Sequence, residues 1–344
     1  MGLGEPDPQR NPFAAAHAPT LAELAGGPWL RGLGPVSEPG RSVAALDATL
    51  GDPGRPQSAT GQSTLLTGRD AVAVMGGPYG PWPGPRLRAL LERDTLFHDA
   101  AAAAPGVGAA LANAYPDAYL EALARPSGRH RRARAPAAVV AATAAGVPLR
   151  GREAWVAGRA VAPDLDGGGW HGAAGGAVRG RAGAADPARG VAVGDVGREA
   201  SRLAALAADH PLTYLDVWLT DQVGHRAELA SATALVERLD RFLAALLEAL
   251  QSRVTLVVTS DHGNLEDALD RRHTHAEVPL IALGPGAGAF AGARDLRDVA
   301  PAVRAAWGAQ GLSATNSTAS YQAPASSSSP AGTSSDAACR AADG

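Results

Sequence analysis

The sequence contains no lysine and only one cysteine. Because Cys339 stands alone, the chain has no internal disulfide framework, and a bound metal ion would need Asp and His ligands. The formal net charge of −3 provides no strong positive field for nucleic acid or an anionic membrane. We find neither a signal peptide nor an apolar stretch of transmembrane length. We therefore expect a cytoplasmic protein without nucleic-acid or membrane partners, and no feature predicts its oligomeric state.

Aspartate and histidine side chains gather at the ends of apolar segments in the second half of the chain. The segments are the predicted strands 213–220, 253–259 and 278–283. The side chains are Asp221 with His225, Asp261 with His262, and His273. Ligands of open α/β sheets bind at the carboxyl ends of strands, so three such groups together indicate a two-metal site. Carboxylate and imidazole together favour Mn²⁺ or Zn²⁺, whereas Mg²⁺ alone would favour oxygen ligands.

Each group also has an ordinary structural explanation. Asp221 can cap the predicted helix 226–250, with His225 as a surface residue in its first turn. Asp261 and His262 can belong to a polar turn. Taken singly, these explanations would be preferred, and it is the conjunction of three groups that favours metal binding.

Strands that alternate with helices predict an α/β protein with a mostly parallel sheet. The predicted helices are 63–75, 86–93, 115–124, 136–145, 196–208, 226–250 and 296–307. The stretch 167–190 is so rich in Gly and Ala that we expect a mobile loop. The predicted domains are a first catalytic part at 1–85, a cap inserted at 86–210, a second catalytic part at 211–311 and a disordered tail at 312–344.

Five segments resemble cofactor-independent phosphoglycerate mutase, in the metalloenzyme branch of the alkaline phosphatase superfamily. Residues 58–69 read Ser-Ala-Thr-Gly-Gln-Ser-Thr-Leu-Leu-Thr-Gly-Arg and resemble that enzyme's serine segment. Residues 221–225, 259–264 and 273–279 resemble its three metal motifs, in the same order, and 296–301 resembles its closing helix. The resemblance implies an alkaline-phosphatase-like three-layer sandwich with a mostly parallel sheet and a smaller inserted α+β cap.

The resemblance also implies roles for individual residues. Ser58 would be the nucleophile that becomes transiently phosphorylated, with Thr60 as its rival. One metal ion would be held by Asp221, His225 and His273, and the second by Asp261, His262 and Ser58. His275 is the rival of His273, which is preferred because it lies six residues before Pro279, as in the family.

The start of the chain departs from the family pattern. The family begins with an apolar strand that ends in Asp-Gly-x-Gly, and its Asp binds the second metal ion. This sequence begins Met1-Gly2-Leu3-Gly4, like the end of that motif without its strand and Asp. We expect a misassigned start codon; otherwise the second metal site is incomplete, and the chain should be poorly stable and weakly active.

The predicted cap is shorter than the insertion of the mutases and closer in size to that of phosphopentomutases. Its best candidates for binding a substrate phosphate are Arg129, Arg131 and Arg132, although a solvated charge run explains them as well. The Cys/Ser-x-Pro-x-Arg context of sulfatases is absent.

The predicted function is a di-metal phosphomutase (an isomerase) or phosphomonoesterase (a hydrolase) that acts on a small phosphorylated metabolite. The alternative is a degenerate metal-binding homologue that lacks the first Asp ligand and is catalytically weak or inactive.

Overall fold

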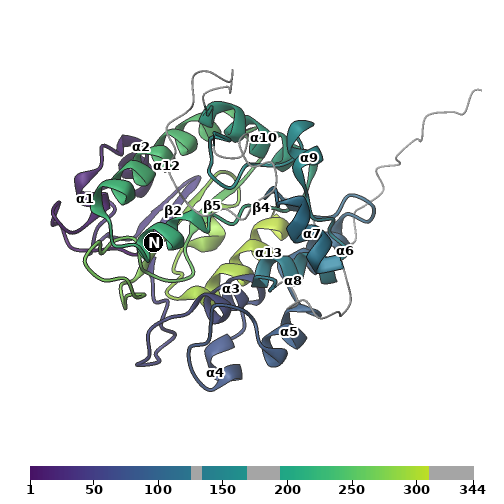
Figure 1. The fold of residues 1–344 in the computed structure, drawn as a ribbon, viewed down its shortest axis with the longest axis horizontal. Coiled ribbons are helices and arrows are strands. Elements are labelled where there is room, and N and C mark those ends of the chain that lie inside the picture. The colour runs from purple at the N-terminus through teal and green to yellow at the C-terminus, as the bar shows by residue number, and fades with distance from the viewer. Residues whose placement is uncertain (125–133, 169–193, 310–344) are drawn as a thin grey trace, which may run out of the picture.

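The computed structural model describes residues 1–124, 134–168 and 194–309 (Figure 1). The strands are β1 (Val36–Glu38), β2 (Arg41–Leu46), β3 (Ala110–Leu111), β4 (Thr213–Tyr214), β5 (Leu256–Thr259) and β6 (Val278–Leu283). The helices are α1 (Pro12–Ala15), α2 (Pro19–Ala25), α3 (Ser58–Thr67), α4 (Ala71–Met75), α5 (Pro85–Leu91), α6 (Leu96–Ala103), α7 (Asp117–Ala124), α8 (Ala137–Ala144), α9 (Arg152–Val156), α10 (Val196–Asp209), α11 (Leu219–Gly224), α12 (Leu229–Ala249) and α13 (Val299–Ala309), with short 3₁₀ turns η2 (Ala287–Phe290) and η3 (Leu296–Asp298). The predicted tail at 312–344, most of the predicted loop at 167–190 and the arginines at 129, 131 and 132 lie outside the described residues.

The main sheet has the strand order β1-β2-β6-β5, and all three of its pairings are antiparallel. The prediction of a mostly parallel sheet is therefore wrong for these strands, and the parallel strand pair of the described residues is β3 with β4. Residues 260–277, all of them described, contain no helix. Without a helical crossover, β5 and β6 pair as antiparallel neighbours.

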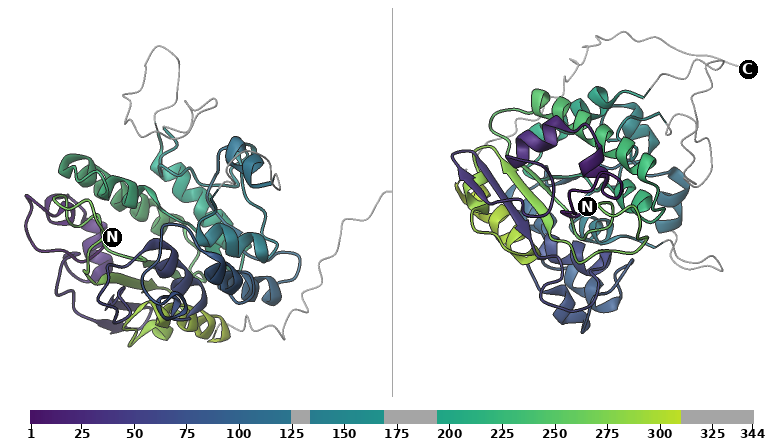
Figure 2. Two further views of the ribbon diagram at one scale, coloured as in Figure 1. Left: turned by 60° about the horizontal axis from the view of Figure 1, so that its bottom comes forward. Right: turned by 90° about the vertical axis from the view of Figure 1, so that its left-hand side faces the viewer.

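Helices cover both faces of this sheet, and Figure 2 shows α12 on one side and α13 on the other. Successive side chains of a strand point to opposite faces. Ile281 of β6 therefore packs into the core that contains α12, whereas Leu280 and Ala282 pack with Phe290 and Val299. The fully apolar sequence of β6 follows from this arrangement, because the strand is buried on both sides.

Residues of the predicted cap share a core with the second catalytic part. Ala110, Val161 and Leu203 belong to the same buried cluster as Leu239 and Phe242 of α12. The boundaries at 86 and 210 stay a prediction.

Several predicted elements differ in extent from those observed. The single helix predicted at 63–75 is two helices, because Gly68 adopts a left-handed conformation (φ 75°) that ends α3, and Asp70 then caps α4. The predicted strand 213–220 is short, since the chain turns into α11 at Leu219. Within the described residues, no helix is long and apolar enough to cross a membrane.

Candidate metal centre

Ser58 is the first residue of α3, and its position depends on how closely this helix approaches the loop after β5. A Cβ at Gly61 would overlap the backbone oxygen of Asp261, so only glycine allows the observed contact. The contact brings Ser58 Oγ to 3.0 Å from His262 Nε2. The spacing Ser-x-x-Gly therefore places a hydroxyl beside an imidazole.

Asp221 and His225 lie on and just after α11, one helical turn apart. This spacing puts both side chains on one face, with His225 Nε2 3.4 Å from Asp221 Oδ1. Both side chains are partly exposed, at 34% for Asp221 and 44% for His225. Asp221 is thus a helical residue rather than one at the mouth of a strand, but its carboxylate still lies beside its predicted partners His225 and His273.

Asp261 and His262 directly follow β5, as predicted. His262 is 2% exposed, and its Nε2 lies 3.5 Å from Asp261 Oδ2 and 3.8 Å from Asp221 Oδ1. This nitrogen therefore lies between two carboxylates and the hydroxyl of Ser58.

His273 completes the cluster from the loop before β6. It is 6% exposed, its ring stacks on His262 with the centroids 3.7 Å apart, and its Nε2 lies 3.3 Å from Asp221 Oδ1. Nε2 of His273 is buried and makes no hydrogen bond. Asp221, His262 and His273 each offer a ligand atom within 4.8 Å of the others.

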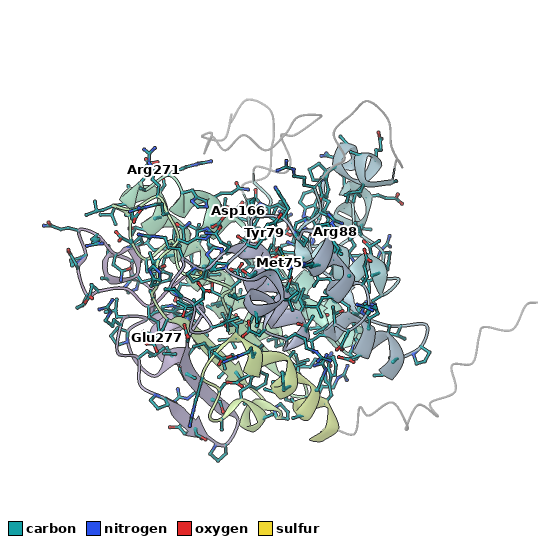
Figure 3. All side chains as sticks on the ribbon, turned by 90° about the horizontal axis from the view of Figure 1, so that it is seen from below. Met75, Tyr79, Arg88, Asp166, Arg271 and Glu277 are labelled. Carbon is teal, nitrogen blue, oxygen red and sulfur yellow. The ribbon has the colours of Figure 1, made fainter. Side chains whose placement is uncertain are left out.

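All three imidazoles use Nδ1 for a main-chain carbonyl and leave Nε2 for the cluster. Nδ1 of His273 pairs with the oxygen of Pro56 at 2.7 Å, and that of His225 with the oxygen of Arg271 at 2.6 Å, in a loop at the edge of the molecule (Figure 3). Nδ1 of His262 lies 3.3 Å from the oxygen of Gly263. A carbonyl requires Nδ1 to carry the proton, so in the neutral form of each ring Nε2 keeps its lone pair. This tautomer is the one that binds a metal ion.

The charges of the cluster shift its titration. Burial alone would raise the pKa of Asp221, but the imidazoles of His273, His262 and His225 outweigh it and lower that pKa to about 2. Burial lowers the pKa of His262, against the opposing effect of Asp261, so its ring is neutral at pH 7. Asp221 is thus ionised and His262 neutral, as metal ligands are. Burial acts to lower the pKa of His273, but the carboxylate of Asp221 and the carbonyl of Pro56 outweigh it and raise that pKa, so a metal ion would have to displace a proton there more often.

Asp216, between β4 and α11, lies behind the cluster. Burial raises the pKa of Asp216 to about 7, and the charges of Asp261 and Asp221 add to the rise. The sequence analysis did not single out this carboxyl.

Thr60 and His275, the rivals of Ser58 and His273, do not face the cluster. The hydroxyl of Thr60 donates to the carbonyl of Gln57 at 3.0 Å, within its own helix. His275 is exposed, and its Nε2 pairs with the oxygen of Pro53 at 3.2 Å. Ser58 and His273 therefore face the cluster, whereas the side chains of Thr60 and His275 contact backbone groups outside it.

The structure brings together all six predicted site residues, while their roles as nucleophile and ligands stay predictions. The predicted division into two metal sites does not appear as two separate groups, since Asp221 and His273 of one site and His262 of the other form one set of ligand atoms. Carboxylate and imidazole donors with free Nε2 atoms suit a divalent transition metal.

Three further residues beside the cluster were not predicted. Asn264, 1% exposed, donates from Nδ2 to Asp221 Oδ1 at 3.2 Å. Glu266 is buried next to it. The ammonium group of Met1 donates to Ser260 Oγ at 2.8 Å and to the oxygen of His262 at 2.7 Å. Asn264 and Glu266 lie in the same polar loop as Asp261, and that position was the signal available in the sequence.

Comparison with known proteins gives a match for part of the chain. Residues 196–309 match the model of the Metalloenzyme superfamily. This region contains Asp221, His225, Asp261, His262 and His273, whereas Ser58 lies outside it. The match confirms, for this region, the predicted resemblance to metalloenzymes, and it implies divalent metal ions without indicating which.

Curated proteins similar to this chain include mutases. The chain is 36% identical over 105 residues to the 2,3-bisphosphoglycerate-independent phosphoglycerate mutase of Cereibacter sphaeroides (strain ATCC 17025), covering 28% of this chain and 21% of that protein. It is 38% identical over 109 residues to the enzyme of the same name from Halobacterium salinarum, covering 29% of this chain and 22% of that protein. The chain thus spans about a fifth of the length of these relatives.

Two solved structures are also similar. The PH0037 protein from Pyrococcus horikoshii superimposes with a TM-score of 0.49 at 13% identity, covering 91% of this chain and 96% of that one. The phosphoglycerate mutase of Leishmania mexicana at low cobalt concentration gives a TM-score of 0.26 at 24% identity, covering 30% of this chain and 24% of that one.

Proposed function

We propose that this protein is a metal-dependent phosphoryl-transfer enzyme that acts on a small phosphorylated metabolite through a phosphorylated Ser58. The observation that supports this proposal most strongly is the convergence of three imidazole Nε2 atoms on Asp221, next to the Ser58 hydroxyl. The names of the similar mutases support the choice of substrate class.

The ligands would be Asp221, His225, Asp261, His262 and His273, with Ser58 as an additional oxygen. Two divalent ions, Mn²⁺ or Zn²⁺, would supply the Lewis acidity that lowers the pKa of a serine hydroxyl and stabilises the oxygens of a phosphoryl group. The main-chain carbonyls beside each Nδ1 hold the imidazoles in the required tautomer before a metal ion arrives.

Ser58 is well placed to be the nucleophile. Its oxygen would form a bond to phosphorus while the bond from phosphorus to the substrate oxygen breaks, and the phosphoryl group would then pass from Ser58 to a second acceptor. Because Ser58 is the first residue of the ten-residue helix α3, the transferred group would face the positive end of that helix. A hydroxyl acceptor makes the enzyme a mutase, and water makes it a phosphatase.

Turnover and covalent labelling test this proposal together. The purified protein is incubated with Mn²⁺ or Zn²⁺ and a panel that includes 2- and 3-phosphoglycerate and sugar phosphates, and the peptide containing Ser58 is analysed by mass spectrometry. We expect metal-dependent turnover, a phosphorylated Ser58 peptide, and loss of both in Ser58→Ala. Thr60→Val is the matched variant and should retain the label.

Two outcomes would contradict the proposal. Equal turnover by the wild type and Ser58→Ala would exclude Ser58 as the nucleophile. Tight metal binding with no turnover on any member of the panel would favour the alternative of an inactive metal-binding homologue.

A further inference from the structure

Glu266 is a buried carboxylate, 3% exposed, whose partners are hydrogen-bond donors. Its Oε2 accepts from the backbone N–H of Gly2 at 2.6 Å and of Asn264 at 2.8 Å, and its Oε1 accepts from the hydroxyl of Thr274. Among the described residues, no arginine or histidine forms an ion pair with it. A carboxyl group is costly to bury unless its oxygens are hydrogen-bonded, and these three donors meet that requirement.

The three donors come from three separate segments of the chain. Asn264 lies two residues after His262, and Thr274 directly follows His273. The backbone N–H of Thr274 also donates to the oxygen of Gly263 at 3.1 Å, so the two histidine segments are joined beside the carboxylate. Glu266 thus connects the supports of both stacked imidazoles.

The surrounding backbone is packed closely against this carboxylate. A Cβ at Gly2 or Gly263 would overlap Glu266 Oε1, and a Cβ at Gly4 would lie 2.9 Å from the main-chain oxygen of Glu266. Because Gly2 and Gly263 have no Cβ, their backbones can approach the Glu266 carboxylate this closely.

We propose that Glu266 is a positioning residue, which sets the relation between His262 and His273 by joining the segments that carry them. This inference rests on the proposed metal centre and adds a residue to it that is not itself a ligand. Partners of metal ligands typically change metal affinity by about 10- to 100-fold when mutated.

Two substitutions separate hydrogen bonding from charge. Glu266→Gln keeps the length and can keep all three bonds, since the hydroxyl of Thr274 can turn to accept from the new amide. Glu266→Ala leaves three donors without an acceptor. Glu277→Gln is the matched control, because Glu277 is an exposed carboxylate in the loop of His273 (Figure 3).

The first measurement is the Mn²⁺ dissociation constant by calorimetry, with the d–d spectrum of bound Co²⁺ as a report on ligand geometry. We expect Glu266→Ala to weaken Mn²⁺ binding by about 10- to 100-fold and alter the spectrum. Glu266→Gln should stay within about threefold of the wild type, like Glu277→Gln. An affinity of folded Glu266→Ala equal to that of the wild type would overturn the inference, as would a loss in Glu266→Gln as large as in Glu266→Ala.

The second measurement does not depend on metal binding. Long-range ¹H–¹⁵N spectra of the metal-free protein report the tautomer of each histidine. We expect His273 to carry its proton on Nδ1 in the wild type and in Glu266→Gln, and to become a mixture of tautomers in Glu266→Ala. If the wild type binds no metal, the proposed function fails while this readout still decides the role of Glu266; unchanged tautomers in Glu266→Ala would refute it.

Discussion

The candidate metal centre has a buried half and an exposed half. His262 and His273 are almost fully buried and stack on each other, whereas the side chains of Asp221 and His225 are 34% and 44% exposed on α11. The buried half is fixed by the Ser58 segment, by the main chain and by Glu266. The exposed half is held by one amide from Asn264 and one carbonyl from Arg271.

The difference indicates how the two halves contribute. A buried imidazole cannot exchange its partners for water, so its position is set when the chain folds. An exposed carboxylate and imidazole can adjust to a ligand at small cost. We infer that the buried half provides geometry and that the exposed half faces the solvent from which the metal ion and the substrate arrive.

The largest expected effect comes from removing one imidazole of each half. His273→Ala should weaken Mn²⁺ binding by about 100-fold or more, and His225→Ala by about tenfold, because a ligand matters at least as much as its supporting partners. Calorimetry with folded variants measures both. His275→Ala is the control in the same loop; a loss there like that of His273→Ala would assign the ligand to His275 instead.

The approach of α3 to the buried half can be broken with one methyl group. In Gly61→Ala the new Cβ overlaps backbone atoms of Asp261, which cannot rotate away. We expect a loss of about 1–3 kcal/mol in the free energy of unfolding, measured with urea. Turnover of the folded variant should also fall, because Ser58 moves away from His262. Gly288→Ala, where the added Cβ meets open space, is the control and should be close to neutral.

The pH dependence of stability tests the region behind the exposed half. The pKa of Asp216 in the folded protein is about 7, above its unfolded value of about 3.9. The stability it contributes is therefore complete below about pH 4 and is lost as the pH rises through 7. Between pH 4 and pH 8, the free energy of unfolding of Asp216→Asn should rise by about 2 kcal/mol relative to that of the metal-free wild type. This value is smaller than the full pKa shift implies, because Asp216 is partly exposed. Urea titrations of both proteins at each pH, with a chelator present, measure this difference. If the free energies of unfolding of the two proteins changed equally between pH 4 and pH 8, the prediction would be contradicted.

The smallest expected effect belongs to the exposed half. A Cβ at Gly224 would overlap Oδ1 of Asn264, whose side chain can turn aside more easily than a backbone can. We expect Gly224→Ala to cost about 1 kcal/mol of stability. It should also weaken Mn²⁺ binding modestly, since Asp221 loses its amide donor. A loss of stability larger than that of Gly61→Ala would reverse the contrast between the two halves.

The sequence predicts the residues of this centre better than it predicts the sheet around them. Asp261 and His262 could be placed because the run before them is apolar and β-branched, and β6 was predicted with its observed bounds. Strand direction could not be predicted, because it depends on which strands become neighbours. The helix 226–250 suggested a crossover from β4 to β5, but β4 pairs with β3 instead.

Local signals were also overlooked in the first part of the chain. Pro12 and Pro19 stand at the first position of α1 and α2, and Gly26 ends α2 in a left-handed conformation. Pro39 and Gly40 likewise mark the turn between β1 and β2. The role of Glu266 offered no such signal, since two of its donors, Gly2 and Thr274, belong to other segments of the chain.

The anchors of the three imidazoles are carbonyl oxygens, which every residue type possesses. Substituting the side chain of Pro56 or Arg271 therefore leaves the anchoring atom in the chain, provided that the backbone keeps its course. A centre supported in this way can keep its geometry while the side chains around it change, as long as the backbone conformation is preserved.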